Sequence, residues 1–157
     1  MTQQPFSRPG AIDLSALKDV VSLHNVGGLA GDGDGADGEH AAGEHGGAPF
    51  VRVEPRVHMR QLVRFLAARG LTVPMVAEVE KITVGGLIMG AGVESASHRV
   101  GLFKDTCLRF ELLLAGGEVV RASERENAAL FEATPFSYGC ASFLLSADVR
   151  VEPALPY

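Results

Sequence analysis

Apolar and polar residues alternate along several short segments of this chain, a pattern typical of strands with one buried face. Residues 50–54 alternate in this way, and residues 108–114 and 143–151 repeat the pattern further along the chain. The glycine pair 116–117 can supply the positive φ angles of a tight turn into residues 119–121, so a β-hairpin is predicted there. The longest run is expected to bury one face made of Phe143, Leu145, Ala147, Val149 and Val151.

Two segments are predicted to form helices, the first from apolar side chains at the three- and four-residue spacing of an amphipathic helix. Residues 59–66 form the clearer one, and Gly70 is a typical C-terminal stop. A shorter helix is predicted to begin at residues 124–127, to carry the apolar pair 130–131 and to end before Pro135. The glycine-rich segment 83–101, between the first helix and the hairpin, is predicted to be a loop. Strand, helix, glycine loop, hairpin, short helix and strand in this order predict an α+β domain with a mixed or antiparallel sheet.

The composition fits one domain with its own core, since 46% of the 157 residues are hydrophobic. The net charge of −5, without a stripe of Lys and Arg, argues against nucleic acid as a partner. Cys107 and Cys140 lie outside any Cys-x-x-Cys pattern, so no disulfide framework or zinc site is predicted and a reduced, intracellular setting is expected. Residues 1–10 lack the features of a secretory signal, and the longest apolar run, Leu112–Ala115, is far below the roughly 20 residues of a membrane helix. We therefore expect a soluble, cytoplasmic chain.

Residues 27–47 form a low-complexity block of Gly, Ala, Asp, Glu and His with a single leucine as its large apolar side chain. Such a segment cannot offset the entropy of ordering, so we interpret it as a disordered insertion between residues 1–26 and residues 48–157. Its acidic residues lack the spacing of an EF-hand loop, which needs a ligand at its fifth position and glycine at its sixth. His40 and His45 could bind metal adventitiously, but the composition favours a solvated linker, and no metal site is predicted.

The segment most informative about function is 83–101, which holds glycines at 85, 86, 90 and 92 among apolar residues rather than among Ser and Pro. Glycines in this context let the main chain approach a ligand, such as a pyrophosphate or a flavin ring, and present backbone amides to it. The alternative is a Gly-Gly turn packed against its own core. No strand leads into a Gly-x-Gly-x-x-Gly helix, so a Rossmann dinucleotide site is not predicted.

Several blocks of residues, in a shared order, make the sequence from Val51 to about Pro153 similar to a known family. The blocks are 51–55, 83–90, Gly92, 94–95, 97–98 and 101–103, extended by 126–127, 130–131, Pro135, Ser137 and Gly139. This stretch resembles the FAD-binding PCMH-type domain of the vanillyl-alcohol-oxidase type, and most closely that of the Δ24-sterol reductases. The resemblance implies a partial FAD-binding domain, with residues 1–26 as a remnant of its N-terminal part and residues 48–157 as the PCMH-type subdomain.

In this family the glycine segment lines the flavin half of FAD, largely through backbone amides. The resemblance therefore assigns cofactor binding to Thr83, Val84, Gly85, Gly86, Leu87, Ile88, Met89, Gly90, Ala91, Gly92, Val93, Glu94 and Ser95, together with His98 and Gly139. His98 by itself is equally well explained as a hydrogen-bonded loop histidine. Gly139 and Cys140 are expected to form a second flavin-facing turn, although this chain has Cys140-Ala141-Ser142 where the family usually has Thr-Leu-Gly.

The resemblance further implies that NADPH reduces FAD, which passes hydride to the side-chain double bond of a sterol substrate. No catalytic residue is assigned: Glu94 is the nearest acid by position, and a solvated or structural carboxylate is its other interpretation. The pyrophosphate-binding subdomain, the substrate domain and the endoplasmic-reticulum membrane anchor of the sterol reductases are expected to lie outside this chain, which could associate with those domains. Two alternatives stay open, namely a non-catalytic remnant of the fold and another flavin oxidoreductase, such as a sugar or lactone oxidase.

Overall fold

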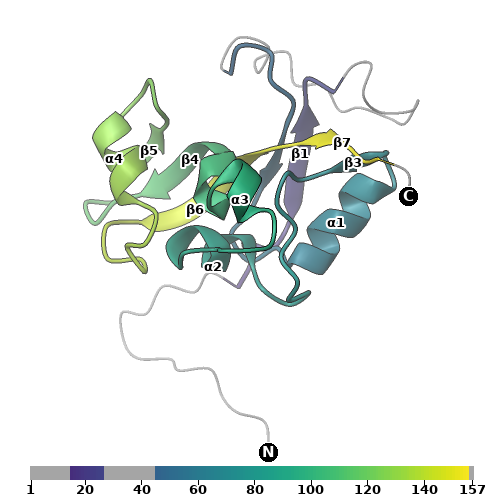
Figure 1. Ribbon diagram of the computed structural model, residues 1–157. Helices are drawn as coiled ribbons and strands as arrows, with labels where there is room; N and C mark the ends of the chain where they lie inside the picture. The colour runs from purple at the N-terminus through teal and green to yellow at the C-terminus, as the bar shows by residue number, and fades with distance from the viewer. Residues whose placement is uncertain (1–14, 27–44, 156–157) are drawn as a thin grey trace, which may run out of the picture.

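The computed structural model describes residues 15–26 and 45–155, which are organised around a five-stranded antiparallel sheet (Figure 1). Its strands lie in the order β1 (Val20–His24), β2 (Phe50–Val53), β6 (Phe143–Arg150), β4 (Cys107–Leu113) and β5 (Val119–Ala122). A smaller antiparallel pair joins β3 (Leu71–Thr72) to β7 (Glu152–Pro153). The α+β class is therefore confirmed with an antiparallel sheet, and Gly117, at a φ of 88°, lies in the turn between β4 and β5.

Short helices connect these strands: α1 (Met59–Ala67), α2 (Val84–Met89), α3 (Ser97–Val100), the 3-10 helix η1 (Phe103–Thr106) and α4 (Ala128–Ala133). Helix α1 matches the predicted spacing, burying Met59, Leu62 and Leu66, and Gly70 follows it at a φ of 69°. Helix α4 begins after Asn127, slightly later than the sequence pattern predicts. None of the helices in residues 15–26 and 45–155 is long and apolar enough to cross a membrane.

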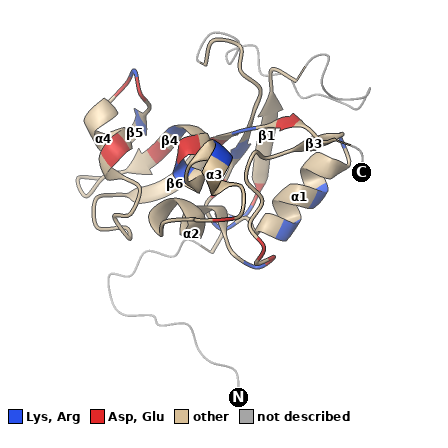
Figure 2. Ribbon diagram, viewed as in Figure 1, with Lys and Arg blue, Asp and Glu red and all other residues tan. Residues whose placement is uncertain are grey.

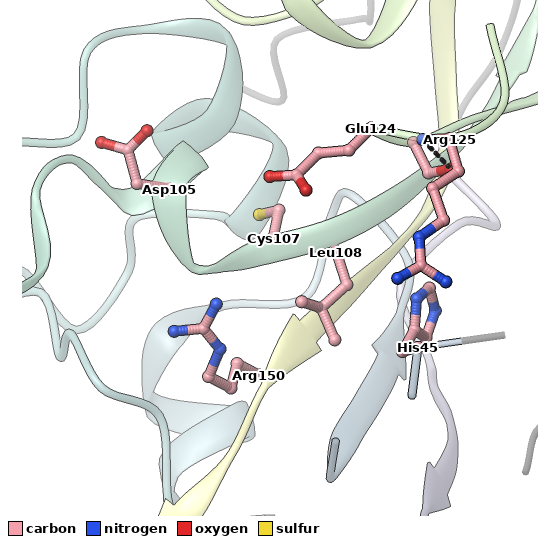
Figure 3. Close-up of a pocket in the computed structure, with 8 residues that line it drawn as sticks. His45, Asp105, Cys107, Leu108, Glu124, Arg125 and Arg150 are labelled. Atoms are coloured by element: carbon pink, nitrogen blue, oxygen red, sulfur yellow. Dashed lines mark hydrogen bonds between the residues drawn. The ribbon is translucent and has the colours of Figure 1, made fainter. Parts of the chain in front are cut away.

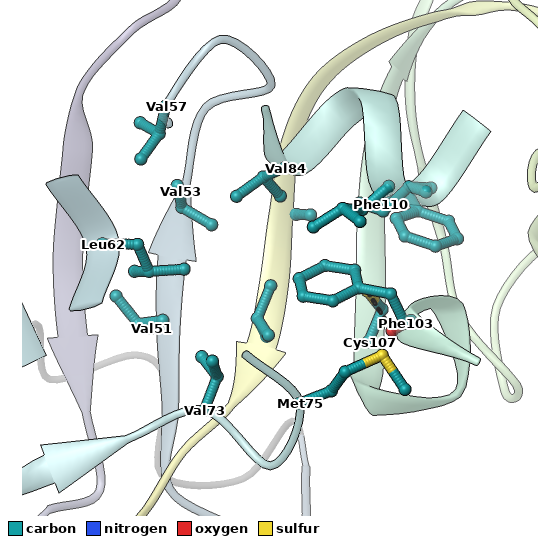
Figure 4. Packing of buried hydrophobic residues seen from close by; sticks show 14 of the residues in the cluster. Val51, Val53, Val57, Leu62, Val73, Met75, Val84, Phe103, Cys107 and Phe110 are labelled. Atoms are coloured by element: carbon teal, nitrogen blue, oxygen red, sulfur yellow. Dashed lines mark hydrogen bonds between the residues drawn. The ribbon is translucent and has the colours of Figure 1, made fainter. Parts of the chain in front are cut away.

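The hydrophobic core lies between one face of the sheet and the helices α1, α2 and η1 (Figure 4). Leu62 from α1 joins Val51 and Val53 from β2 in this core, and Phe103 from η1 joins Phe110 from β4. All five side chains are fully buried. Because α1 and α2 are both fixed on this core, the N-terminal end of α2 is held close to the end of β2, where the candidate site lies.

Two irregularities in the β4–β6 pairing change which side chains reach the core. The register shifts between Cys107 and Arg109, and again at Leu112, which pairs with Leu144 while its neighbour Glu111 pairs with Ser146. Each shift inserts one extra residue, which moves the following side chains to the other face. The predicted core face of β6 is therefore wrong at its start: Leu144 is buried in the core, whereas Phe143 and Leu145 are only partly buried.

The other face of the sheet carries a buried ion-pair cluster centred on Asp148, which is 1% exposed. Its carboxylate accepts hydrogen bonds from Arg52 Nε at 2.7 Å and Nη2 at 3.0 Å, and Arg109 Nη2 lies 3.0 Å away. His45 Nε2 lies 3.1 Å from the same carboxylate. Most of the block interpreted as a disordered insertion, residues 27–44, lies outside the described residues, but His45 at its end contacts the sheet.

Candidate functional site

The glycine segment, predicted to be a loop, begins with helix α2. Thr83 caps this helix, because its Oγ1 accepts a hydrogen bond from the Gly86 amide at 3.1 Å. Burial of Val84, Leu87 and Ile88 stabilises the helix although it contains two glycines, each about 1 kcal/mol less favourable than alanine. None of the glycines at 85, 86, 90 and 92 has a positive φ; Gly101, at the end of the segment, does, at 80°. The loop prediction was therefore wrong, and these glycines are needed for a reason other than backbone dihedral angles.

Two of the glycines let elements of the core approach each other closely. A Cβ on Gly85 would lie 2.7 Å from Pro55 Cβ and 3.0 Å from the Pro55 carbonyl oxygen. A Cβ on Gly92 would lie 2.9 Å from both Phe103 Cβ and Leu87 Cδ2. These distances are shorter than side-chain carbons tolerate, so Gly85 and Gly92 follow the alternative considered from the sequence, in which the glycines pack against their own core.

Several backbone amides of the segment, those of α2 among them, are already hydrogen-bonded within the chain. Val84 N donates to Val57 O at 2.9 Å, Gly85 N to Pro55 O at 2.8 Å, Gly90 N to Gly86 O at 2.9 Å and Gly92 N to Leu87 O at 3.1 Å. The expectation that these amides are free for a ligand is therefore wrong. Buried amides must find partners, and here the helix and the end of β2 provide them. The exposed Gly86 of α2 therefore offers a ligand space rather than a donor.

An apolar groove of about 480 Å³ lies beside α2. Its lining residues come from the end of β2, from α2 and from the chain that leads into β6: Pro55, Arg56, Thr83, Gly85, Gly86, Met89, Gly90, Tyr138, Gly139, Ser142, Phe143 and Leu144. The structure thus brings Gly139 to the same groove as Gly85 and Gly86. Helix α2 contains no charged residue, as Figure 2 shows, so this wall of the groove is uncharged.

The second wall of the groove is the turn formed by residues 134–142, which has an unusual backbone. Phe136 and Tyr138 adopt positive φ angles of 63° and 51°, and Gly139 follows at 80°. A non-glycine residue in this region costs of order 1–3 kcal/mol, and such strain gathers at functional sites. The Ser137 hydroxyl lies 3.5 Å from Met89 Sδ, which ties the turn to α2. Tyr138 is 78% exposed and lies at the edge of the groove.

Ser142 ends this turn, immediately before β6; in the sequence it is distinguished only by its departure from the family pattern. The residue is 4% exposed. Its hydroxyl oxygen is buried, and it has no hydrogen-bond partner within the described parts of the chain. A sequence signal did exist, since a serine replaces a glycine at a predicted flavin-facing turn, but sequence could not show whether its hydroxyl is satisfied.

The remaining predicted residues lie away from the groove. Val84, Leu87 and Ile88 belong to the core, and Gly92 packs under η1; Ala91, Val93 and Ser95 are exposed beyond the end of α2. His98 is exposed on α3, where its Nδ1 lies 2.8 Å from the Ser95 carbonyl oxygen. Glu94 Oε2 lies 3.4 Å from the Glu78 amide, which supports the structural interpretation of this carboxylate. The assignment of these residues to cofactor binding stays a prediction.

A smaller cavity of about 180 Å³ shares no lining residue with the groove (Figure 3). It is bordered by the charged residues Asp105, Glu124, Arg125 and Arg150 and by Cys107. Burial raises the pKa of the Cys107 thiol far above its usual range, so this thiol stays protonated and unreactive at neutral pH. Among residues 15–26 and 45–155, no group of three or more His, Cys, Asp or Glu side chains is arranged to hold a metal ion.

Comparison with known proteins assigns the fold and the family. The model of a protein family described as "FAD binding domain" matches residues 11–123, more than half of the chain. Human Delta(24)-sterol reductase is 49% identical over 107 residues, which cover 68% of this chain and 21% of the human protein. The pea Delta(24)-sterol reductase is 44% identical over 107 residues, 68% of this chain and 19% of the pea protein. The chain thus spans about a fifth of the length of these relatives.

A more distant relative and a solved structure extend the comparison. Mouse L-gulonolactone oxidase is 29% identical over 103 residues, which cover 66% of this chain and 23% of the mouse protein. The crystal structure of 6-hydroxy-D-nicotine oxidase from Arthrobacter nicotinovorans superimposes with a TM-score of 0.61 and 23% identity, covering 77% of this chain and 28% of that chain. The superposition shows that the two proteins share a fold. The chain belongs to the FAD binding domain family, and within it resembles the Δ24-sterol reductases.

Proposed function

We propose that the groove beside α2 holds the flavin part of FAD. The observation that carries this proposal is the meeting of α2 and the turn 134–142, two segments that the sequence resemblance assigns to the flavin, in one groove. Its volume of about 480 Å³ lies within the range of about 300–1,000 Å³ typical of ligand pockets. The exposed Gly86 and the half-buried Gly90 leave the groove wall without side chains. The Ser142 hydroxyl finds no hydrogen-bond partner among the described residues, so the residues present fit a flat ring with polar groups along its edge.

Each wall has a separate task in this proposal. Thr83 caps α2, and the Gly85 amide fixes the helix to the Pro55 carbonyl oxygen after β2, so that the helix presents its glycine face at a constant position. Met89 and Leu144 supply apolar surface that excludes water from the groove. FAD, when bound, supplies the hydride-transfer chemistry, and the protein binds, orients and tunes it. No proton donor is assigned, because Glu94 lies away from the groove and is bonded to the Glu78 amide.

For the whole protein, we propose a reductase that uses NADPH, through FAD, to reduce the C24 double bond of a sterol side chain. The identity of 49% to human Delta(24)-sterol reductase supports this substrate class over that of L-gulonolactone oxidase, to which the chain is 29% identical. The relatives are about five times longer than the matched segment. The remaining parts of such a protein would hold the FAD pyrophosphate and the sterol, and would contact this chain around the groove.

Substitution at Gly86 tests the proposed groove. Gly86→Leu places a side chain into the groove, whereas Gly116→Leu makes the corresponding change in the turn after β4, where an added Cβ meets no atom within 4 Å. FAD is titrated into the 157-residue chain and followed by flavin fluorescence, with the thermal midpoint of each variant measured in parallel. We expect weak, non-covalent binding that Gly86→Leu reduces at least tenfold while Gly116→Leu leaves it unchanged. Equal binding by Gly86→Leu and the wild-type chain would contradict the assignment.

A further inference from the structure

A purely structural role does not explain the buried Ser142 hydroxyl. Ser142 is 4% exposed, and its Oγ is the buried side-chain polar atom for which the described residues provide no hydrogen-bond partner. Burying a hydroxyl without a partner is unfavourable, because the group loses its hydrogen bonds to water and gains none in exchange. The other buried serine of this region, Ser146 on β6, has the Glu111 carboxylate 3.5 Å from its Oγ.

The position of Ser142 gives the hydroxyl a possible partner outside the chain. The residue lines the groove together with Gly86, Gly90 and Tyr138. Other polar groups along α2 are already engaged: the Thr83 hydroxyl accepts the Gly86 amide, and the Gly90 amide donates to the Gly86 carbonyl oxygen. Besides the exposed side chains of Arg56 and Tyr138, a ligand that enters this groove therefore meets apolar surface and one buried hydroxyl that no described residue engages.

We propose that Ser142 Oγ forms a hydrogen bond with the bound flavin and positions it in the groove. This inference rests on the proposed function, because it names a contact in the same site. A flavin matches the groove chemically: its ring is flat and apolar on its faces, and it carries carbonyl oxygens and an imide N–H along one edge. A serine hydroxyl can donate to the former or accept from the latter.

The inference predicts effects of opposite sign on stability and on binding. Ser142→Ala removes an unsatisfied hydroxyl from the free protein, so its thermal midpoint should stay level or rise. The same change removes a hydrogen bond from the flavin complex, so FAD binding should weaken by about three- to tenfold. A serine that served only the fold, for example through an internal water, would instead lower the midpoint on removal and leave binding unchanged.

The experiment compares the wild-type chain with Ser142→Ala, Ser142→Gly and the control Ser146→Ala. Riboflavin and FAD are titrated separately into each protein, with flavin fluorescence for affinity and visible absorption for the environment of the ring. Thermal midpoints are recorded without flavin. We expect both Ser142 variants to weaken binding and to shift the flavin absorption bands, and Ser142→Ala to do so without a loss of midpoint, while Ser146→Ala binds both ligands as the wild-type chain does.

Three results would overturn the inference. Equal flavin affinity of Ser142→Ala and the wild-type chain would remove the proposed contact and leave the groove assignment intact. Tighter binding by Ser142→Gly would show that the hydroxyl obstructs the flavin instead of holding it. No flavin binding by the wild-type chain would remove the proposed function, and the inference with it.

Discussion

The two walls of the groove are stabilised in different ways. Helix α2 is capped by Thr83, its amides are hydrogen-bonded and its apolar side chains are buried in the core. The turn 134–142 holds Phe136 and Tyr138 at positive φ and ends at Ser142, whose hydroxyl has no hydrogen-bond partner in residues 15–26 and 45–155. The difference indicates that α2 is fixed by the fold itself, whereas the turn keeps strain and unused hydrogen-bonding capacity where a ligand can use them.

The largest expected effect on stability is at the contact that fixes α2. Gly85→Ala would place a Cβ 2.7 Å from Pro55 Cβ, so the helix and the end of β2 must separate. We expect the free energy of unfolding to fall by about 1–3 kcal/mol, the usual cost of overpacking. Chemical denaturation measures this change, and Gly116→Ala, where nothing lies within 4 Å, is the matched control. A Gly85→Ala variant as stable as the control would show that α2 is not held by this close approach.

The cap of α2 should give a smaller effect. Thr83→Ala removes the oxygen that accepts the Gly86 amide, so the free energy of unfolding should fall by about 1 kcal/mol. Thr83→Ser keeps the hydroxyl and should retain most of the stability. Denaturant midpoints of the two variants distinguish these outcomes, and equal loss in both would mean that the threonine methyl group, not the cap, matters.

The turn should respond in the opposite direction. Tyr138 is 78% exposed, so Tyr138→Gly removes little buried surface while it relieves a positive φ of 51°. We expect the free energy of unfolding to rise by up to about 1 kcal/mol, less the added chain entropy of glycine. Val119→Gly, at a residue of β5 that is 56% exposed, should be destabilising, since its backbone is extended. A clear loss of stability in Tyr138→Gly would show that the turn is not strained.

Much of the sheet could be predicted from the sequence, because alternation over four or more residues identifies a half-buried strand. The start of β6 could not be, since the extra residue at the register shift next to Leu144 exchanges the two faces. Helix α2 was missed because local helix propensity was the only guide. Its two glycines disfavour a helix by more than the Thr83 cap favours one, but the burial of Val84, Leu87 and Ile88 decides the conformation.

The candidate site was predicted from the resemblance to a known family more than from the local sequence pattern. Nothing local in the sequence links Gly86 to Gly139, which meet in one groove only through the packing of α2 beside the start of β6. The amides of α2 were expected to be free for a ligand, but they are hydrogen-bonded within the chain; the sequence alone does not show which acceptors the amides find. His45 was assigned to a solvated linker from composition, yet its ring lies 3.1 Å from the Asp148 carboxylate, a contact made across the chain.

Hydrogen exchange with and without FAD is the most direct test that this groove binds flavin through both walls. FAD should slow exchange strongly in peptides covering residues 134–144, and only slightly in α2, whose amides are already bonded. Strand β1, at the far edge of the sheet from β5, should not change. Exchange that is unchanged at 134–144, or slowed only outside the groove, at FAD concentrations that saturate the fluorescence signal would contradict the flavin site.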